Sequence, residues 1–420
     1  MGTTPPVAIN SGDTAWVLVS SALVLLMTAP GLALFYGGMA RRKNVLSILM
    51  QCFMCLAIVS VLWVVYGYSL AFGHSKGFLT PYIGGLDWFM LKGVDINTAN
   101  ADYAATIPHQ AYMVFQMMFA VITPALVIGS FAERVKFSAW VWFTVLWLTF
   151  VYCPIAHMVW ASDGLAGHTW GALDFAGGTV VHMNAGIAGL ATALFLGKRV
   201  GTDKQGMHNV PFVMIGASLL WFGWFGFNAG SAVAANGLAT SAFVVTNTAT
   251  AAAAISWAVC EWIFTGKPTM VGAASGAVAG LVAITPASGF VNVGGSLWIG
   301  FLVSVICYCM VAFVKPKLGY DDTLDAFGVH FCGGLWGALA TGLFAVKAIN
   351  SNGSGVFDGN PGQFMIQVKA CVLTAVFSFV VTWLICLIID KTIGMRVAVE
   401  DEVIGLDLSQ HHERAYTILD

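Results

Sequence analysis

The sequence predicts an all-α integral membrane protein, and three observations support this fold class. Lys, Arg, Asp and Glu make up 9% of the 420 residues, whereas soluble domains carry about 25%. Apolar residues make up 58% of the chain, and its mean hydropathy is +0.82. Eleven apolar segments are each long enough to cross a bilayer as a helix, which takes about 20 residues. We therefore expect eleven transmembrane helices rather than two or three soluble domains.

Hydrophobic runs separated by polar connections define the spans. The expected spans are 14–38, 45–73, 109–131, 138–160, 174–197, 211–233, 240–264, 269–287, 293–314, 324–347 and 363–390. None shows the alternating pattern of a barrel strand, so a transmembrane β-barrel is excluded. The eighth span carries Gly272, Gly276 and Gly280, whose spacing of four residues is typical of a helix-packing seam.

Basic residues follow the odd-numbered spans and predict the orientation of the chain. Fourteen lie on one side: Arg41, Arg42, Lys43, Arg134, Lys136, Lys198, Arg199, Lys204, Lys267, Lys315, Lys317, Lys391, Arg396 and Arg414. The other side carries only Lys76, Lys92 and Lys347. By the positive-inside rule the N-terminus is outside the cell membrane and the tail is cytoplasmic. We expect a transmembrane domain over 1–390 and a cytoplasmic regulatory tail over 391–420, and we expect no signal peptide in 1–13, which lack a positive n-region.

A shared pattern relates the fifth span to the tenth. His182 and His330 each begin the sequence His-x-x-x-Gly-x-x-Gly. Five spans followed by five more must invert, because five is odd, so we expect two inverted five-helix repeats plus one extra helix. The aspartates expected to correspond are Asp174 and Asp325. The glycines would let the two helices cross closely, with both imidazoles at the crossing.

Ionisable residues within membrane helices are generally functional. The carboxylates fall near the ends of the spans, but His182 lies eight residues inside its span, or about 12 Å deep at 1.5 Å per residue. Either histidine alone would suit a packing role. Their matched places in the two repeats favour a functional pair.

Several function classes are excluded by what the sequence lacks. A net charge of −2 offers no surface for nucleic acid. All nine cysteines lie in apolar runs, and Cys52-x-x-Cys55 and Cys307-x-Cys309 have no nearby His or carboxylate that would complete a zinc site. No Ser-His-Asp order suggests an enzyme, and no cofactor is expected.

Five motifs resemble the ammonium transporter family (Amt/Mep), which is related to the Rhesus proteins. The motifs are Tyr36-Gly37-Gly38 with Lys43-Asn44, Ile155-Ala156-His157-Met158-Val159-Trp160, Asp174-Phe175-Ala176-Gly177-Gly178-Thr179-Val180-Val181-His182, Trp224-Phe225-Gly226-Phe227-Asn228-Ala229-Gly230-Ser231 and Phe327-Gly328-Val329-His330. The similarity extends to Gly405-Leu406-Asp407 in the tail. It implies a homotrimer of eleven-helix subunits, each with its own pore for ammonium and methylammonium.

The resemblance also implies roles for individual residues. They are an outer recruitment site of Trp160, Phe119 and Ser231, a gate of Phe119 and Phe227, paired pore histidines His182 and His330, and a vestibule supported by Asp174. Gln116 shares a helix face with Phe119 at a spacing of three residues, so we expect it to support the same vestibule. Aromatic faces attract a small cation, and a hydroxyl oxygen accepts its N–H bonds. An apolar pore would favour loss of a proton near the gate and passage as ammonia, a route closed to potassium. The proton would follow through the histidines, making uptake electrogenic.

The family tail contacts the cytoplasmic P-II signal protein, which implies the same partner here. His412 stands where many relatives have glycine, so the geometry of that contact departs from the family pattern. Two other functions remain open. A Rhesus-like ammonia or carbon dioxide channel is disfavoured by Trp160, and an ammonium sensor would have to signal through a partner.

Overall fold

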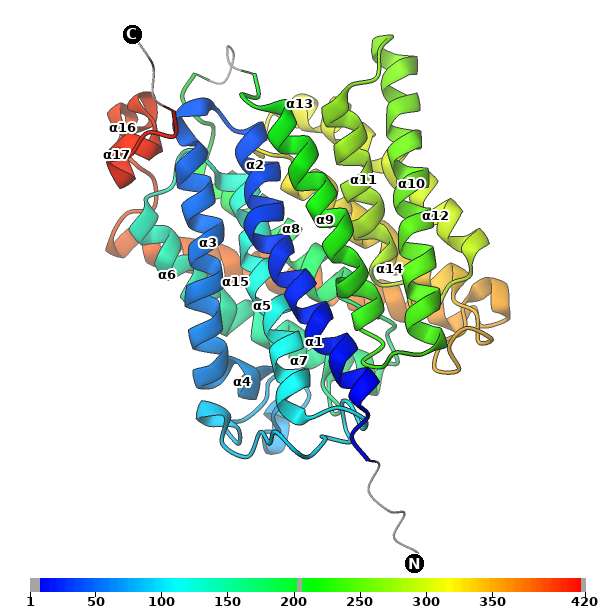
Figure 1. Cartoon of the computed structure of the whole chain (residues 1–420). Helices are drawn as coiled ribbons and strands as arrows, with labels where there is room; N and C mark the ends of the chain where they lie inside the picture. The colour runs from blue at the N-terminus through cyan, green and yellow to red at the C-terminus, as the bar shows by residue number, and fades with distance from the viewer. Residues whose placement is uncertain (1–7, 202–205, 417–420) are drawn as a thin grey trace, which may run out of the picture.

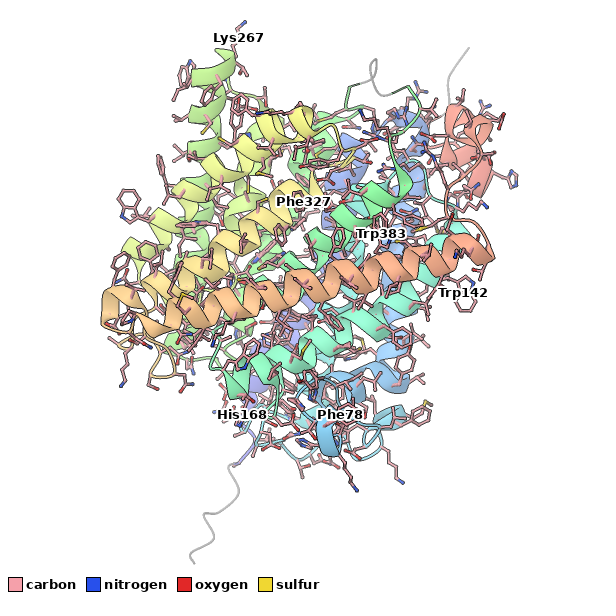
Figure 2. All side chains as sticks on the ribbon, turned by 180° about the vertical axis from the view of Figure 1, so that it is seen from behind. Phe78, Trp142, His168, Lys267, Phe327 and Trp383 are labelled. Atoms are coloured by element: carbon pink, nitrogen blue, oxygen red, sulfur yellow. The ribbon has the colours of Figure 1, made fainter. Side chains whose placement is uncertain are left out.

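The computed structural model describes residues 8–201 and 206–416, and this part of the chain is a bundle of helices with no strand. Figure 1 shows α1 beginning at one end of the molecule and the tail helices α16 and α17 at the other. We call these ends the N-terminal face and the tail face. Large apolar side chains such as Trp142 and Trp383 are exposed on the outside of the bundle, where α15 crosses it (Figure 2).

Within residues 8–201 and 206–416, ten helical stretches are long and apolar enough to span a membrane. Four of them are single helices: α5 (His109–Phe131), α9 (Val210–Gly230), α10 (Gly237–Thr265) and α15 (Gly362–Thr392). Four contain two helices each: Ser11–Met39 has α1 (Ser11–Leu26) and α2 (Ala33–Met39), Arg42–Phe72 has α3 (Val45–Leu62) and α4 (Tyr68–Phe72), Phe137–Thr169 has α6 (Phe137–Trp147) and α7 (Cys153–Trp160), and Val293–Leu318 has α12 (Val293–Cys309) and α13 (Lys315–Leu318). The last two, Gly178–Leu196 and Phe327–Phe344, contain α8 (Asn184–Leu196) and α14 (Cys332–Phe344). The expected span 269–287 contains the shorter α11 (Met270–Ile284). The helical prediction is confirmed, and α11 makes eleven. α16 (Val399–Ile404) and α17 (Leu406–His411) form the tail.

Side-chain caps explain where several helices begin. Asn10, Asn209, Asn236, Thr269 and Asn292 accept backbone N–H bonds at the starts of α1, α9, α10, α11 and α12 respectively. Each cap satisfies N–H groups that have no partner within the first helical turn. These short polar residues therefore set the first residue of each helix within otherwise apolar sequence.

The two His-x-x-x-Gly-x-x-Gly segments have matching structures. A π-helical turn at Gly178–Met183 leads into α8, and a second at Phe327–Phe331 leads into α14. α8 and α14 each have 13 residues. A Cβ on Gly186 would lie 2.3 Å from the backbone nitrogen of Phe331, and a Cβ on Gly334 would lie 2.9 Å from the carbonyl oxygen of Gly178. The expected close crossing is therefore present, and each helix supplies one glycine to it.

Asp322, not Asp325, corresponds to Asp174. Asp174 accepts hydrogen bonds from the backbone N–H groups of Gly177, Gly178, Thr179 and Val180. Asp322 accepts in the same way from two N–H groups at the start of the turn 327–331, at 2.9 and 3.4 Å. Each stands eight residues before its histidine. The pairing with Asp325 was therefore wrong.

Asp325 is engaged elsewhere. Its carboxylate pairs with Lys315 at 2.6 Å rather than capping a helix. The fifth span also begins later than expected, at Gly178 instead of 174, because Asp174 caps the helix from outside it.

A buried ion-pair network holds the tail face together. Glu133 contacts Arg41 at 2.5 Å and Arg199 at 2.9 Å, and Arg199 contacts Asp321 at 2.9 Å. Burial alone would raise the pKa of Asp321, but the hydrogen bonds and charge of Arg199, followed by the charge of Arg134, lower it to about 2. The connections after α2, α5 and α8 are thus joined by charge as well as by packing.

The tail docks on the connection between α2 and α3. Asp407 accepts a bond from the backbone N–H of Ser47 in the first turn of α3, at 2.8 Å, and Asn44 accepts one from the N–H of Leu406 at 2.8 Å. Gly405 has φ +110°, and a Cβ there would lie 2.6 Å from the carbonyl oxygen of Lys43. This position therefore requires glycine both for its conformation and for the close approach.

The crossing of the two repeats yields a stability prediction. Gly186→Ala places a methyl group against the backbone of Phe331, which cannot move aside as a flexible side chain can. We expect a loss of about 1–3 kcal/mol, the usual cost of overpacking, seen as a lower unfolding temperature of the purified protein in detergent. Gly237→Ala is the matched control, because a Cβ there meets nothing within 4 Å. Equal unfolding temperatures for the two variants would contradict the close crossing.

Candidate functional site

A small cavity lies towards the N-terminal face, between α5, α7 and the end of α9. Its volume is about 130 Å³, and it is lined by Tyr103, Tyr112, Phe115, Gln116, Phe119, Trp160, Phe175, Ser231 and Val233. Aromatic rings form most of the wall, and hydroxyl and amide groups are spaced among them. A cavity of this size suits a ligand of a few non-hydrogen atoms.

Trp160 and Phe119 face each other at right angles. Their ring centroids are 5.6 Å apart, with planes at 88°. The indole Nε1–H of Trp160 donates to the carbonyl oxygen of Asp174 at 3.0 Å. Since four backbone N–H groups hold the carboxylate of Asp174, the helix cap also fixes the orientation of the tryptophan.

Two polar side chains leave acceptor atoms for a ligand. The Ser231 hydroxyl donates to the carbonyl oxygen of Phe227 at 2.8 Å, so its own oxygen remains able to accept a hydrogen bond. The amide nitrogen of Gln116 donates to the Tyr112 hydroxyl at 3.1 Å, and its Oε1 is buried with no partner in the described part of the chain. The cavity therefore offers oxygen acceptors beside aromatic faces, a combination suited to a small cation.

A continuous row of rings leads inwards from this cavity. The centroids of Phe119 and Phe227 are 4.3 Å apart, those of Phe227 and His182 are 6.0 Å apart, and those of His182 and His330 are 5.5 Å apart. All four side chains are at least 97% buried. Trp224 stacks on His182 at 5.3 Å. The row is thus apolar except for the two imidazoles.

The imidazole nitrogens are poorly satisfied. Neither nitrogen of His182 has a hydrogen-bond partner among the described residues, nor does Nδ1 of His330. Nε2 of His330 lies 3.4 Å from the hydroxyl of Tyr36, which donates to the carbonyl oxygen of Leu126 at 3.1 Å. The two imidazole planes differ by only 12°, and no direct hydrogen bond between these rings is present in the structure.

A second cavity opens from His330 towards the tail face. It has a volume of about 590 Å³, and its wall includes Tyr36, Glu261, Asp325 and His330. Most of the remaining wall is apolar. Phe227 and His182 therefore lie between two cavities that approach them from opposite faces.

Most of the predicted site residues come together along this line. Trp160, Phe119, Ser231 and Gln116 share the small cavity, and Phe227, His182 and His330 follow. Asp174 does not line the small cavity but supports it through Trp160.

The sequence analysis did not assign Tyr103, Tyr112, Phe175, Tyr36 or Trp224 to the site. Tyr36, Phe175 and Trp224 lie within the motifs that carry the family resemblance, which is the signal that could have identified them.

Comparisons with known proteins agree with this architecture. Residues 15–416 match the model of the Ammonium Transporter Family. An ammonium transporter of Bacillus subtilis is 50% identical over 409 residues, covering 97% of this chain and 99% of the relative. The crystal structure of Mep2 from Saccharomyces cerevisiae superposes with a TM-score of 0.87 at 34% identity, covering 94% of this chain and 89% of Mep2. A structure described as a sensor Amt protein gives a TM-score of 0.86 at 28% identity, covering 95% of this chain and 98% of the other.

The match extends across both repeats and into the tail, so it includes every element that forms the cavities and the row of rings. The chain therefore belongs to the ammonium transporter family.

Proposed function

We propose that the protein carries ammonium across the cell membrane, recruiting it as a cation and passing it as ammonia. The observation that carries this proposal is the buried row from Phe119 to His330 between two cavities. Its rings offer no set of oxygen atoms that could replace the water around an ion. Methylammonium, which has the same charge and can also lose a proton, is expected as a second substrate.

Recruitment takes place in the small cavity. The rings of Trp160 and Phe119 attract the cation, a contact worth about 0.5–2 kcal/mol depending on desolvation. The Ser231 hydroxyl accepts one of its N–H bonds, and Oε1 of Gln116 is a second acceptor in reach of the cavity. Asp174 supports this vestibule through its helix cap without touching the cation.

The gate then separates ammonium from other cations. Phe119 and Phe227 close the inner side of the cavity, so an ion entering the row would lose its hydration at a cost of several kcal/mol or more. Ammonium avoids much of this cost by leaving its proton behind. Potassium has no proton to leave and is excluded.

The paired histidines carry the proton onward. The unsatisfied nitrogens of His182 and the free Nδ1 of His330 can each accept or donate a proton without first breaking a protein hydrogen bond. A water or a shift of either ring would complete the connection between them. Transfer of both ammonia and a proton makes uptake electrogenic.

The tail face is cytoplasmic in this proposal. It carries 13 of the 14 basic residues that the positive-inside rule assigns to the cytoplasm, and the remaining one, Lys204, lies outside the described residues. The assembly is a homotrimer in a plasma or inner membrane. Residues 391–420 form a regulatory tail, and a cytoplasmic P-II signal protein is its partner.

A sensor function is the second candidate because of the likeness to the sensor Amt protein. A Rhesus-like channel is the third, and the aromatic recruitment cavity with Trp160 speaks against it. Both differ from the main proposal in charge movement, since a neutral-gas channel or a sensor without a conducting pore gives no ammonium current.

Solid-supported membrane recordings on proteoliposomes test the function. We expect currents after jumps in ammonium and methylammonium concentration and none after an equal jump in potassium, because only the first two can leave a proton at the gate. Empty liposomes control for passive ammonia flux. Absence of an ammonium current would contradict electrogenic transport, and a comparable potassium current would contradict deprotonation at the gate.

Trp160 tests the recruitment step. In Trp160→Leu an apolar side chain remains but the aromatic face is lost, so the ammonium concentration giving half-maximal current should rise. The binding free energy lost should be at most about 2 kcal/mol, the upper range of a cation–π contact. Exclusion of potassium should persist because Phe119 and Phe227 are unchanged. Trp142→Leu, on the outside of the bundle, is the matched control. An unaltered concentration dependence at equal protein density would limit Trp160 to packing.

The histidines test the relay. His182→Ala and His330→Ala each remove one imidazole from the row, so we expect loss of the ammonium current or entry of potassium, measured in the same proteoliposomes. Exposed His168, outside the row, supplies the control His168→Ala. Normal current with intact selectivity in both single variants would return the two histidines to a packing role.

A further inference from the structure

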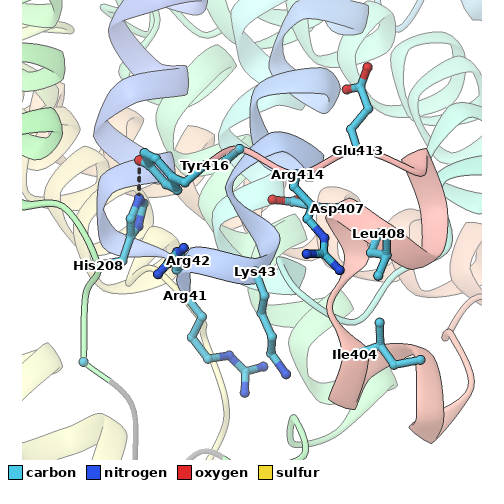
Figure 3. A pocket seen from close by; sticks show the side chains of 12 residues that line it. Arg41, Arg42, Lys43, His208, Ile404, Asp407, Leu408, Glu413, Arg414 and Tyr416 are labelled. Carbon is cyan, nitrogen blue, oxygen red and sulfur yellow. Dashed lines mark hydrogen bonds between the residues drawn. The ribbon is translucent and has the colours of Figure 1, made fainter. Parts of the chain in front are cut away.

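A third cavity lies on the tail face, apart from the transport path. Its volume is about 620 Å³. The close-up in Figure 3 shows its wall, which is built from residues 41–43, His208 and the tail residues Ile404, Asp407, Leu408 and Glu413 to Tyr416. It shares no lining residue with the cavity that reaches His330. Substrate passage therefore does not account for it.

The cavity is held open by contacts that do not involve a ligand. Lys43 donates to the carbonyl oxygens of Glu402 and Val403 at 2.9 and 2.6 Å, and the docked Asp407 and Leu406 fix the other side. Tyr416 meets the ring of His208, whose Nε2 lies 3.0 Å from the tyrosine hydroxyl. The walls are thus preorganised.

Positive charge dominates the lining. Arg41, Arg42, Lys43 and Arg414 face two carboxylates, those of Asp407 and Glu413. Figure 3 shows the Glu413 carboxylate turned away from the cationic side chains.

The cations differ in how far they are already neutralised. Arg41 pairs with Glu133, while its Nη2 is buried without a partner in the described chain. Arg42 lies over the Tyr416 ring at 5.5 Å, and within residues 8–201 and 206–416 neither Arg42 nor Arg414 forms an ion pair. The lining thus includes one guanidinium from the connection after α2 and one from the tail, neither of which forms an ion pair in the described residues.

We propose that this cavity binds a phosphate-bearing anion that bridges the tail and the connection between α2 and α3. Guanidinium groups match the oxygen geometry of phosphate and bind it through two parallel hydrogen bonds. The volume exceeds that of a phosphate group alone, and Ile404, Leu408 and Tyr416 provide an apolar wall for the carbon part of a phosphate ester. Either a soluble phosphate ester or the headgroup of an anionic phospholipid supplies this chemistry.

Binding changes the balance of charge that docks the tail. Without an anion, Arg42 and Arg414 repel each other across the cavity. With one, both are attracted to the same group, so the docked position of the tail is favoured. His412, beside Glu413 and Arg414, already holds a left-handed conformation with φ +57°, which is strained for a residue other than glycine. The bound anion would supply contacts that hold the turn at His412 in this conformation.

Hydrogen–deuterium exchange on the full-length protein tests the proposal without measuring transport. One arm adds glycerol 3-phosphate in neutral detergent, with sodium chloride matching the ionic strength of the blank. The other compares nanodiscs of phosphatidylglycerol with nanodiscs of phosphatidylcholine. We expect slower exchange over residues 404–416 in one arm, which identifies the soluble ester or the lipid headgroup as the source.

The double variant Arg42→Gln with Arg414→Gln should bind the effective probe at least about tenfold more weakly, the change expected for losing a hydrogen bond to a charged group. Arg414→Lys should retain part of the binding. Lys76→Gln with Lys92→Gln removes two exposed charges from the N-terminal face and serves as the control. Unchanged exchange with both probes, or an undiminished response in the Arg42 and Arg414 variant while its unfolding temperature stays normal, would overturn the proposal.

Discussion

The desolvation of a charged ion is the constraint on which the proposed transport mechanism depends. Phe119, Phe227, His182 and His330 form a buried row in which no oxygen cage replaces lost water. In the proposed mechanism a cation is held in the small cavity beside Trp160, where aromatic faces and hydroxyl oxygens compensate in part for its lost hydration. The proposal explains selectivity by chemistry, because a protonated amine can become neutral and an alkali metal ion cannot.

Holding such a row in place requires the two repeats to meet closely, and glycine makes this possible. At Gly186 and at Gly334 the backbone of the other repeat lies so close that a Cβ atom would collide with it. The aspartates Asp174 and Asp322 satisfy the N–H groups that begin the two histidine-bearing segments. Asp174 also connects the fold to the site through the indole of Trp160. Helix capping, helix crossing and the proposed recruitment of substrate therefore depend on neighbouring residues.

Much of the fold could be predicted because the length of each apolar segment and the uneven distribution of basic residues can be read directly from the sequence. The helical spans and the glycine crossing follow from such local patterns. The pairing of Asp174 with Asp325 was wrong because Asp322 and Asp325 both lie shortly before His330. Only the spacing of eight residues to the histidine, which Asp322 shares with Asp174, distinguishes the two. The shortness of α11 depends on a turn after Ile284 that hydropathy does not reveal.

The site was predictable only in part. The family resemblance assigned Trp160, Phe119 and Ser231, which come from three separate helical regions, and only Gln116 was placed by its spacing of three residues from Phe119. Tyr103 reaches the cavity from the long connection between α4 and α5, which has no helical or strand periodicity to indicate its course. Long-range packing decides such contacts, and a single sequence does not encode it in a local pattern.

The central claim, that ammonium gives up its proton in order to cross the buried row, is tested most directly by a solvent isotope comparison. Ammonium-driven currents would be recorded in the same proteoliposomes in H₂O and D₂O, with the potassium current through added gramicidin reporting the effect of solvent viscosity on an intact ion. The account predicts that the ammonium current falls further in D₂O than the gramicidin current does, because a proton must be transferred. An equal fall in the two currents would contradict the account, in which loss of the proton limits the ammonium current.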